Sequence, residues 1–260
     1  MFRPRIIPTL LLKDKGLVKS IKFKKYKYIG DPINAVRIFN DQLADELVFL
    51  DIDATNENRT IDIQFVKSIS KEADMPFAIG GGIKNIETIK KLLNAGAEKV
   101  IINTEAVNNP EFVKNAVLEF GSSTIVVSID LGKNLFGKIR VYTNSGMKRT
   151  NIDPYNYVKE IEKLGAGEII LNSIYKDGTM EGYDLKLIEM VSKNVSIPVV
   201  ASCGAGSYNH FNEAIKIGYA SAVAAGSLFV YHGPRKAVLI NYPSKDDMKS
   251  IFKNNYNENM

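Results

Sequence analysis

The chain has 260 residues, of which 45% are hydrophobic and 24% are charged, as in ordinary globular proteins. It contains no run of 18 apolar residues, so we expect no membrane span, no signal peptide and no membrane partner. A single cysteine, Cys203, excludes an internal disulfide and fits a cytoplasmic location. The net charge of +5 is mild. The lysines of residues 19–27 favour a solvated loop, or one that attracts anionic substrates, over a nucleic-acid site.

Eight short apolar runs alternate with amphipathic segments along the chain. They are mostly apolar on both faces, as strands of a buried parallel sheet must be, and they cover residues 5–12, 46–51, 75–79, 99–103, 124–130, 168–172, 197–201 and 221–226. Asp31-Pro32 and Asp153-Pro154 each combine an N-cap with a proline in the first turn, and therefore predict helix starts. Eight strand–helix units in about 250 residues predict one closed (β/α)₈ TIM barrel. An open doubly wound sheet is the alternative.

Residues 135–150 interrupt this alternation. They predict two short strands around Asn144-Ser-Gly146, a hairpin inserted after the fifth strand.

The chain also repeats itself at an offset of 122 residues, which relates Gly82 to Gly204 and Glu46 to Glu168. Strands two to four are thus echoed in strands six to eight. We therefore expect one domain over residues 1–260, with half-barrels at about 1–122 and 123–244 and a C-terminal tail at 245–260.

Glycine-rich turns follow the strands at matching places in the two halves. Gly80-Gly-Gly82 and Asn103-Thr104 end the third and fourth strands, and Gly204-Ala-Gly206 and Gly226-Ser227 end the seventh and eighth. Backbone N–H groups in such turns approach a phosphate closely, and the following helix adds its positive dipole. Glycines also simply form tight turns, yet two matched clusters favour two phosphate sites. We expect a phosphorylated small molecule to span the barrel mouth, and we expect no metal and no cofactor.

Aspartates at the carboxyl ends of the strands are candidates for acid–base chemistry, because active sites of such barrels lie at that end. Asp51 ends the second strand, Asp130 ends the fifth and Asp177 follows the sixth. The alternative role of each is an N-cap or a loop anchor. That alternative is weakest for Asp130, which closes the apolar run of residues 125–129.

The opposite ends of the strands carry a second set of charges. The first residues of strands one, two, four and six are Arg5, Glu46, Lys99 and Glu168. They are either solvated strand ends or a closed salt-bridge ring that plugs or gates an axial passage. The apolar residues expected to wall such a passage, as they fill the interior of any small barrel, are Ile6, Val48, Ile101 and Ile170.

Over nearly its whole length the chain resembles the cyclase (HisF-type) subunit of imidazole glycerol phosphate synthase, a lyase-type enzyme of histidine biosynthesis. The resemblance lies in residues 45–51 (DELVFLD), 80–83 (GGGI), 165–169 (GAGEI) and 177–179 (DGT). It implies that a HisH-like glutaminase docks at the bottom of the barrel and releases ammonia, which passes a charged gate and crosses the barrel to the substrate. The implied gate residues are Arg5, Glu46, Lys99 and Glu168. The implied phosphate and substrate positions are Lys19, Asp51, Gly82, Asn103, Thr104, Asp177, Gly178, Gly204, Gly226 and Ser227.

One departure separates the chain from that family's mechanism. The family uses two aspartates as acid and base, and the second is present as Asp130, but Leu11 stands where the first belongs. Leucine can neither donate nor accept a proton, so cyclase turnover would fall on the order of 10²- to 10⁴-fold. Asn172 and Cys203 are further departures. Leu11 and the stretch 226–244 make the chain most similar to the branch that accompanies acetamidino modification of surface sugars.

That similarity implies a second partner, an ATP-using sugar amidotransferase that places an amidine on a nonulosonic-type sugar of a lipopolysaccharide or another surface glycan. The leading hypothesis is an ammonia-accepting barrel in a glutamine-dependent amidotransferase complex, without cyclase turnover of its own. The alternatives are a histidine-pathway cyclase, a phosphoribosyl isomerase of the related half-barrel family and a non-catalytic scaffold. The isomerase also needs paired carboxylates and has no use for the gate, while the retained gate and glycine clusters argue against the scaffold.

Overall fold

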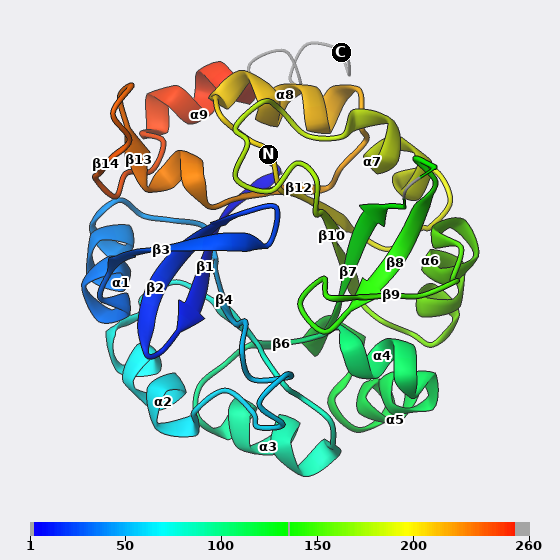
Figure 1. Cartoon of the computed structure of the whole chain (residues 1–260). Coiled ribbons are helices and arrows are strands. Elements are labelled where there is room, and N and C mark those ends of the chain that lie inside the picture. Colours follow the sequence, from blue (N-terminus) through cyan, green and yellow to red (C-terminus); the bar gives the residue numbers. More distant parts are fainter. Residues whose placement is uncertain (1–2, 135, 253–260) are drawn as a thin grey trace.

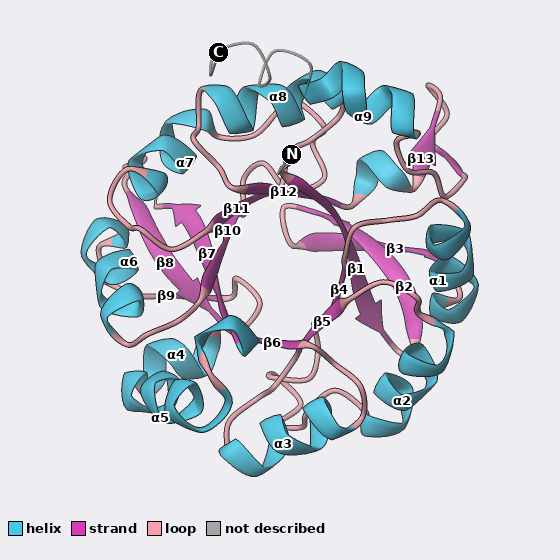
Figure 2. Cartoon of the chain, turned by 180° about the vertical axis from the view of Figure 1, so that it is seen from behind, coloured by secondary structure: helices cyan, strands magenta, loops and turns pink. Residues whose placement is uncertain are grey.

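The computed structural model describes residues 3–134 and 136–252 of the chain. Eight parallel strands close into a barrel, because each pairs with the next along the chain and β12 pairs with β1 (Figure 1, Figure 2). They are β1 Arg5–Lys13, β4 Leu47–Asp51, β5 Phe77–Gly80, β6 Lys99–Ile102, β7 Ile125–Lys133, β10 Glu168–Ser173, β11 Val199–Ser202 and β12 Ala222–Ala225. The closed barrel confirms the predicted fold and excludes the open sheet. Each strand begins within two residues of its predicted start.

Helices form a ring around the barrel (Figure 2). Asp31 and Asp153 accept backbone hydrogen bonds at the starts of α1 and α6, which confirms both predicted N-caps. Among the described residues no helix is long and apolar enough to cross a membrane. The helices are α1 Pro32–Asp41, α2 Ile63–Glu72, α3 Ile86–Asn94, α4 Thr104–Asn108, α5 Pro110–Phe120, α6 Pro154–Lys163, α7 Leu185–Ser192, α8 Tyr208–Lys216 and α9 Lys245–Phe252. The helix α9 lies in the segment expected as a tail and packs against α8, and residues 253–260 lie outside the described part.

Two antiparallel hairpins extend from the carboxyl ends of β1 and β7. The first consists of β2 Gly16–Ile21 and β3 Lys24–Gly30, and it corrects the expectation of a solvated loop over residues 19–27. Lys19 in particular is buried. The second consists of β8 Ile139–Thr143 and β9 Lys148–Arg149, with its turn at Asn144–Gly146 as predicted. Leu135, the first residue of that predicted hairpin, lies outside the described residues. A third, shorter hairpin, β13 Tyr231–His232 and β14 Ala237–Val238, lies on the outer side of the barrel (Figure 1).

The apolar core has two parts, as alternation along a strand requires. The larger part lies between strands and helices, and the smaller part fills the barrel interior with Ile7, Val48, Ala78, Ile101, Val126, Ile170, Val200, Ala222 and Ala224. Ile6 belongs to the outer part, which corrects its predicted place along an axial passage. Side chains along a strand alternate between its two faces. Arg5 contacts charged partners at the barrel axis, so Ile7, and not Ile6, lies on the same face of β1 as Arg5.

Candidate functional site at the carboxyl ends of the strands

Two clefts open at the carboxyl ends of the strands, with about 850 Å³ and about 570 Å³ of space. The first lies over β4, β5 and β6, and the second over β10, β11 and β12. The clefts adjoin each other, because both are lined by Leu11, Ser20, Phe23, Leu50 and Asn172. Every sequence-predicted phosphate or substrate residue lines one of them. The first contains Asp51, Gly82, Asn103, Thr104 and also Asp130, and the second contains Lys19, Asp177, Gly178, Gly204, Gly226 and Ser227.

The glycine turns are shaped for close backbone approach. Gly82 adopts φ +66°, and a Cβ placed on it would lie 1.8 Å from the carbonyl oxygen of Arg59. In the second half Gly204 adopts φ +112°, and its Cβ would lie 2.3 Å from the carbonyl oxygen of Gly182. Only glycine fits either position. Both turns line a cleft, where their backbone can approach a ligand without hindrance from a side chain.

Helix starts face the same clefts. In the first cleft Thr104 begins α4, and the side chain of the N-cap residue Asn103 makes no capping hydrogen bond to the helix. In the second cleft Ser227 begins a short 3₁₀ turn, Ser227–Phe229, after Gly226. The unpaired N–H groups of these first turns add partial positive charge on each side of the barrel mouth.

Lys19 is the one cation among the predicted substrate residues. Its ammonium donates a 2.5 Å hydrogen bond to the carbonyl oxygen of Thr9 and lies against Gly226, where an added Cβ would be 2.4 Å from Nζ. Burial lowers the pKa of Lys19 to about 8, although the carboxylate of Asp177 opposes the shift. The ammonium thus stands inside the second cleft, beside the glycine turn that would receive a phosphate.

Asp130 is buried, and its neighbours are amides. Burial raises the pKa of Asp130 to about 6, against hydrogen bonds from Asn172 and Asn103 that favour the ionised carboxylate. Asn172 Nδ2 donates to Asp130 Oδ1 at 2.8 Å and to Ser128 Oγ at 2.9 Å. The sequence identified Asn172 only as a departure from the family it resembles. The identity of a residue within a strand does not indicate which side chains it will contact. A pKa near neutrality suits a group that exchanges protons.

Cys203 borders the second cleft in a left-handed backbone conformation, with φ +69°. Its thiol lies 3.9 Å from Asn172 Oδ1, and burial raises its pKa well above the usual range for cysteine. The side chain is therefore a neutral thiol at physiological pH, and a weak donor to Asn172.

The other two predicted carboxylates hold loops in place. Asp51 pairs with Arg59 at 2.5 Å and accepts backbone hydrogen bonds from the turn that follows β4. Asp177 accepts hydrogen bonds from Ser20 Oγ at 2.7 Å and from the Phe23 N–H at 3.1 Å. Asp177 thereby fixes the turn of the β2–β3 hairpin across the barrel mouth.

Leu11 occupies the junction of the two clefts. It pairs in register with Leu50 on β4, and both side chains line both clefts. The junction of the clefts therefore has an apolar wall, which can neither donate nor accept a proton. Asp51 forms an ion pair, and Asp177 holds a hairpin in place. Of the three aspartates predicted for the site, Asp130 alone has neither role and faces the cleft.

Both hairpins lie over this junction. Ser145 Oγ donates to the carbonyl oxygen of Ile52 at 2.7 Å, and the Asn144 N–H donates to Thr104 Oγ1 at 3.0 Å. A Cβ on Gly146 would lie 2.9 Å from the Phe23 ring, so the two turns touch. In Figure 1 the hairpins are seen on opposite sides of the barrel opening. The clefts are thus partly roofed by residues from both halves of the chain.

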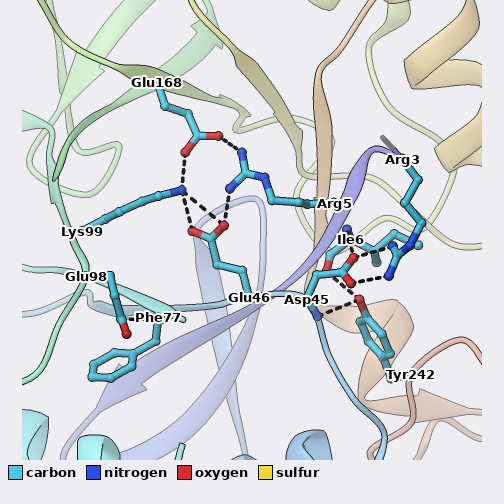
Figure 3. Close-up of polar contacts among 10 residues, drawn as sticks. All are labelled: Arg3, Arg5, Ile6, Asp45, Glu46, Phe77, Glu98, Lys99, Glu168 and Tyr242. Carbon is cyan, nitrogen blue, oxygen red and sulfur yellow. Dashed lines mark hydrogen bonds and ion pairs between the residues drawn. The ribbon is translucent and has the colours of Figure 1, made fainter. Parts of the chain in front are cut away.

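At the amino ends of the strands a closed ring of charges lies on the barrel axis (Figure 3). Arg5 pairs with both Glu46 and Glu168, and Lys99 Nζ lies 3.0 Å from Glu46 Oε1 and 2.9 Å from Glu168 Oε2. Both carboxylates are buried, and each has two cationic partners. The four predicted residues therefore form the expected ring. Its two carboxylates cannot lose a cation without leaving a buried charge uncompensated.

The chain matches the model of the family described as "Histidine biosynthesis protein" over residues 5–234. It is 48% identical to the imidazole glycerol phosphate synthase subunit HisF of Hydrogenobaculum sp., over 88% of this chain and 91% of that protein. It is 47% identical to the subunit HisF of Thermococcus onnurineus, over 89% and 91%. It is also 45% identical to a Pseudomonas aeruginosa protein provisionally named imidazole glycerol phosphate synthase subunit hisF2, over 94% and 97%. The chain thus belongs to the HisF-type histidine biosynthesis protein family and is homologous to the cyclase subunit of imidazole glycerol phosphate synthase.

Proposed function

We propose that this chain is the ammonia-accepting barrel of a glutamine-dependent amidotransferase complex that modifies a surface sugar with an acetamidino group. A glutaminase of the HisH type would bind at the charged ring, and an ATP-using sugar amidotransferase would use the ammonia. The observation that carries this proposal is the combination of an intact ring with Leu11 at the cleft junction. The charged ring through which ammonia would enter is intact. The pair of carboxylates that would use ammonia inside the barrel lacks one member, because Leu11 stands in its place.

The interior of the barrel supports transfer from ring to mouth. Ammonia needs a water-poor path, because protonation to ammonium removes its nucleophilic lone pair. The side chains between the ring and the clefts are apolar, and Ile7, Val48 and Ile101 are buried among them. Leu50 packs on top of this cluster and lies beside Leu11, so the apolar lining continues up to the clefts. An aspartate at position 11 would end that lining.

The clefts support binding of a phosphorylated small molecule. The turns at Gly82 and Gly204 face opposite halves of the mouth, and Lys19 supplies a cation in the second cleft. We assign phosphate-binding roles to these turns, and to the helix starts at Thr104 and Ser227. In this proposal the ligand binds in the clefts, and the barrel does not transform it.

The alternative is a histidine-pathway cyclase, which the names of the relatives favour and for which Asp130, with a pKa of about 6, is an available acid or base. Assay of the purified chain with ammonium and the phosphoribulosyl substrate of that cyclase separates the two functions. We expect a turnover at least about 10²-fold below that of an ordinary cyclase subunit, because one of two proton-transferring groups is missing. A rate within tenfold of an ordinary subunit contradicts our proposal. A gain in rate for Leu11→Asp would assign the deficit to that position.

A further inference from the structure

Positive charge is concentrated in the two hairpin segments at the barrel mouth. Residues 13–28 and 131–151 together contain twelve lysines and arginines and one acidic residue, Asp14. The rest of the chain contains 22 basic and 28 acidic residues. The net positive charge of the protein therefore arises entirely from these two segments, and the rest of the sequence is net negative.

Most of these cations are exposed and unpaired. We call eight of them the mouth cations: Lys22, Lys24, Lys25, Lys27, Lys133, Lys138, Lys148 and Arg149. In the part of the chain that the structure describes, none of the eight forms an ion pair with an acidic side chain. Lys27 and Lys133 lie over the rings of Tyr231 and Tyr175 instead. Nearby acids are already engaged, since Asp53 pairs with Lys13 and Glu57 with Arg59.

Large apolar side chains are exposed among the same cations. Phe136 is 94% exposed, Met147 68%, Tyr28 64% and Ile21 44%. A small anion drawn into the clefts gains nothing from such side chains on the outer surface of the hairpins. A protein surface does, because interfaces combine apolar anchors with a polar rim, and complementary charge steers the partner and fixes its orientation.

We propose that the two hairpins form a docking surface for the acidic face of the protein that takes up ammonia at the barrel mouth. This inference rests on the proposed function and adds where the acceptor protein binds and through which residues. The surface lies at the carboxyl ends of the strands, opposite the charged ring, so a glutaminase and the acceptor protein bind at opposite ends of the barrel. The hairpins touch at Phe23 and Gly146, which places the partner directly over the clefts.

The test compares two variants with equal changes in net charge. The mouth variant carries Lys24→Glu, Lys25→Glu, Lys148→Glu and Arg149→Glu. The control carries Lys67→Glu, Lys71→Glu, Lys90→Glu and Lys216→Glu, four exposed lysines on α2, α3 and α8. Binding of each to the sugar amidotransferase of the same organism is measured by biolayer interferometry, with the glutaminase in place. We expect the mouth variant to bind at least about tenfold more weakly at low salt, and the difference to shrink as salt is raised, because exposed charges are screened.

The outcomes of this test distinguish failure of the docking surface from failure of the proposed function. Equal binding by the mouth variant, the control and the wild type overturns the docking surface, even if the complex amidates the sugar. Weakened binding without any amidation by the wild type supports the docking surface and contradicts the proposed function. If the mouth variant keeps the partner but loses affinity for inorganic phosphate or for a single-stranded oligonucleotide, the cations serve those anions and the docking surface is wrong.

Discussion

Leu11 and Leu50 lie side by side on β1 and β4 where the two clefts meet, and Asp130 lines the first of these clefts. The contrast is chemical. The leucines present apolar side chains at the centre of the mouth, whereas Asp130 carries a carboxyl group hydrogen-bonded by amides. Burial favours its neutral form, and Asn172 favours its ionised form. The balance leaves the pKa of Asp130 at about 6, above the ordinary value of 3.8.

Stability measurements test this balance. Because the folded-state pKa of about 6 exceeds the ordinary value, the native state binds this proton more tightly than the unfolded chain does. That contribution is fully present below pH 4 and is lost as the pH rises through 6. Asp130→Asn keeps an acceptor for Asn172 and removes the buried charge. We expect it to raise the free energy of unfolding on the order of 3 kcal/mol at pH 8 and not at pH 4. Urea unfolding at both pH values is the measurement, and an equal gain at both contradicts the assignment.

The hydrogen bond from Asn172 gives a second expectation. Asn172→Leu removes a donor that stabilises the ionised carboxylate and should therefore raise the pKa of Asp130 further above 6. The carboxyl carbon of Asp130, followed by NMR through a pH titration, reports the change. Asn194→Leu is the control, since that amide donates to the carbonyl oxygen of Met190 at the end of α7. An unchanged pKa in Asn172→Leu would show that the amide does not tune Asp130.

The two mouth hairpins show what local sequence can and cannot predict. The turn of β8–β9 contains Asn144-Ser-Gly146, and Asn144 and Ser145 adopt φ of +55° and +53°. Asparagine and glycine favour such turns, so this hairpin was predictable. The β2–β3 turn places Lys22 and Phe23 at φ of +55° and +57°, a conformation that neither residue favours. Asp177, from the other half of the chain, holds that turn, so no local signal could have predicted it.

The glycine turns were predictable because clustered glycines directly after a strand mark a turn in the sequence itself. Gly82→Ala should abolish phosphate binding in the first cleft and leave the second cleft intact, since its Cβ would collide with the Arg59 carbonyl. Gly121→Ala is the matched control: Gly121 also has a positive φ, but nothing lies within 4 Å of its Cβ. We expect the control to cost only about 1 kcal/mol and to keep both sites. Phosphate soaks of crystals, with thermal melts in parallel, distinguish the variants. Phosphate density at the Gly82 turn of Gly82→Ala contradicts the assigned role.

At the scale of the whole molecule, the closed barrel, its strand starts and the four ring residues follow from sequence patterns. Buried parallel strands are continuously apolar, and their charged first residues are brought together only if the sheet closes. The sequence pattern did not show which residues of β1 face the barrel interior, because Ile6 and Ile7 are equally apolar. It also left the bridge from Asn172 to Asp130 unassigned, since that contact depends on the register between β7 and β10.

The ring offers a test of coupling between the two ends of the barrel. Lys99→Ala leaves Arg5 as the one cation between Glu46 and Glu168 and removes a side chain from the barrel axis. Glutamine hydrolysis and amidation should then no longer be coupled. We expect more glutamate released per amidated sugar with glutamine, and unchanged amidation with ammonium salts. Arg37→Ala, which breaks an exposed ion pair between α1 and α2, is the control. If Lys99→Ala keeps the wild-type ratio, the ring is a structural cluster only.

In our proposal, ammonia crosses this barrel and is used beyond it. The complete complex with glutaminase and sugar amidotransferase is supplied with glutamine labelled with nitrogen-15 in its amide, in the presence of excess unlabelled ammonium. Mass spectrometry of the amidated sugar then gives the source of its new nitrogen. If ammonia travels through the apolar interior from the ring to Leu11, the product carries the label undiluted by the ammonium in solution. A product whose label is diluted to the isotopic composition of free ammonium would contradict the account.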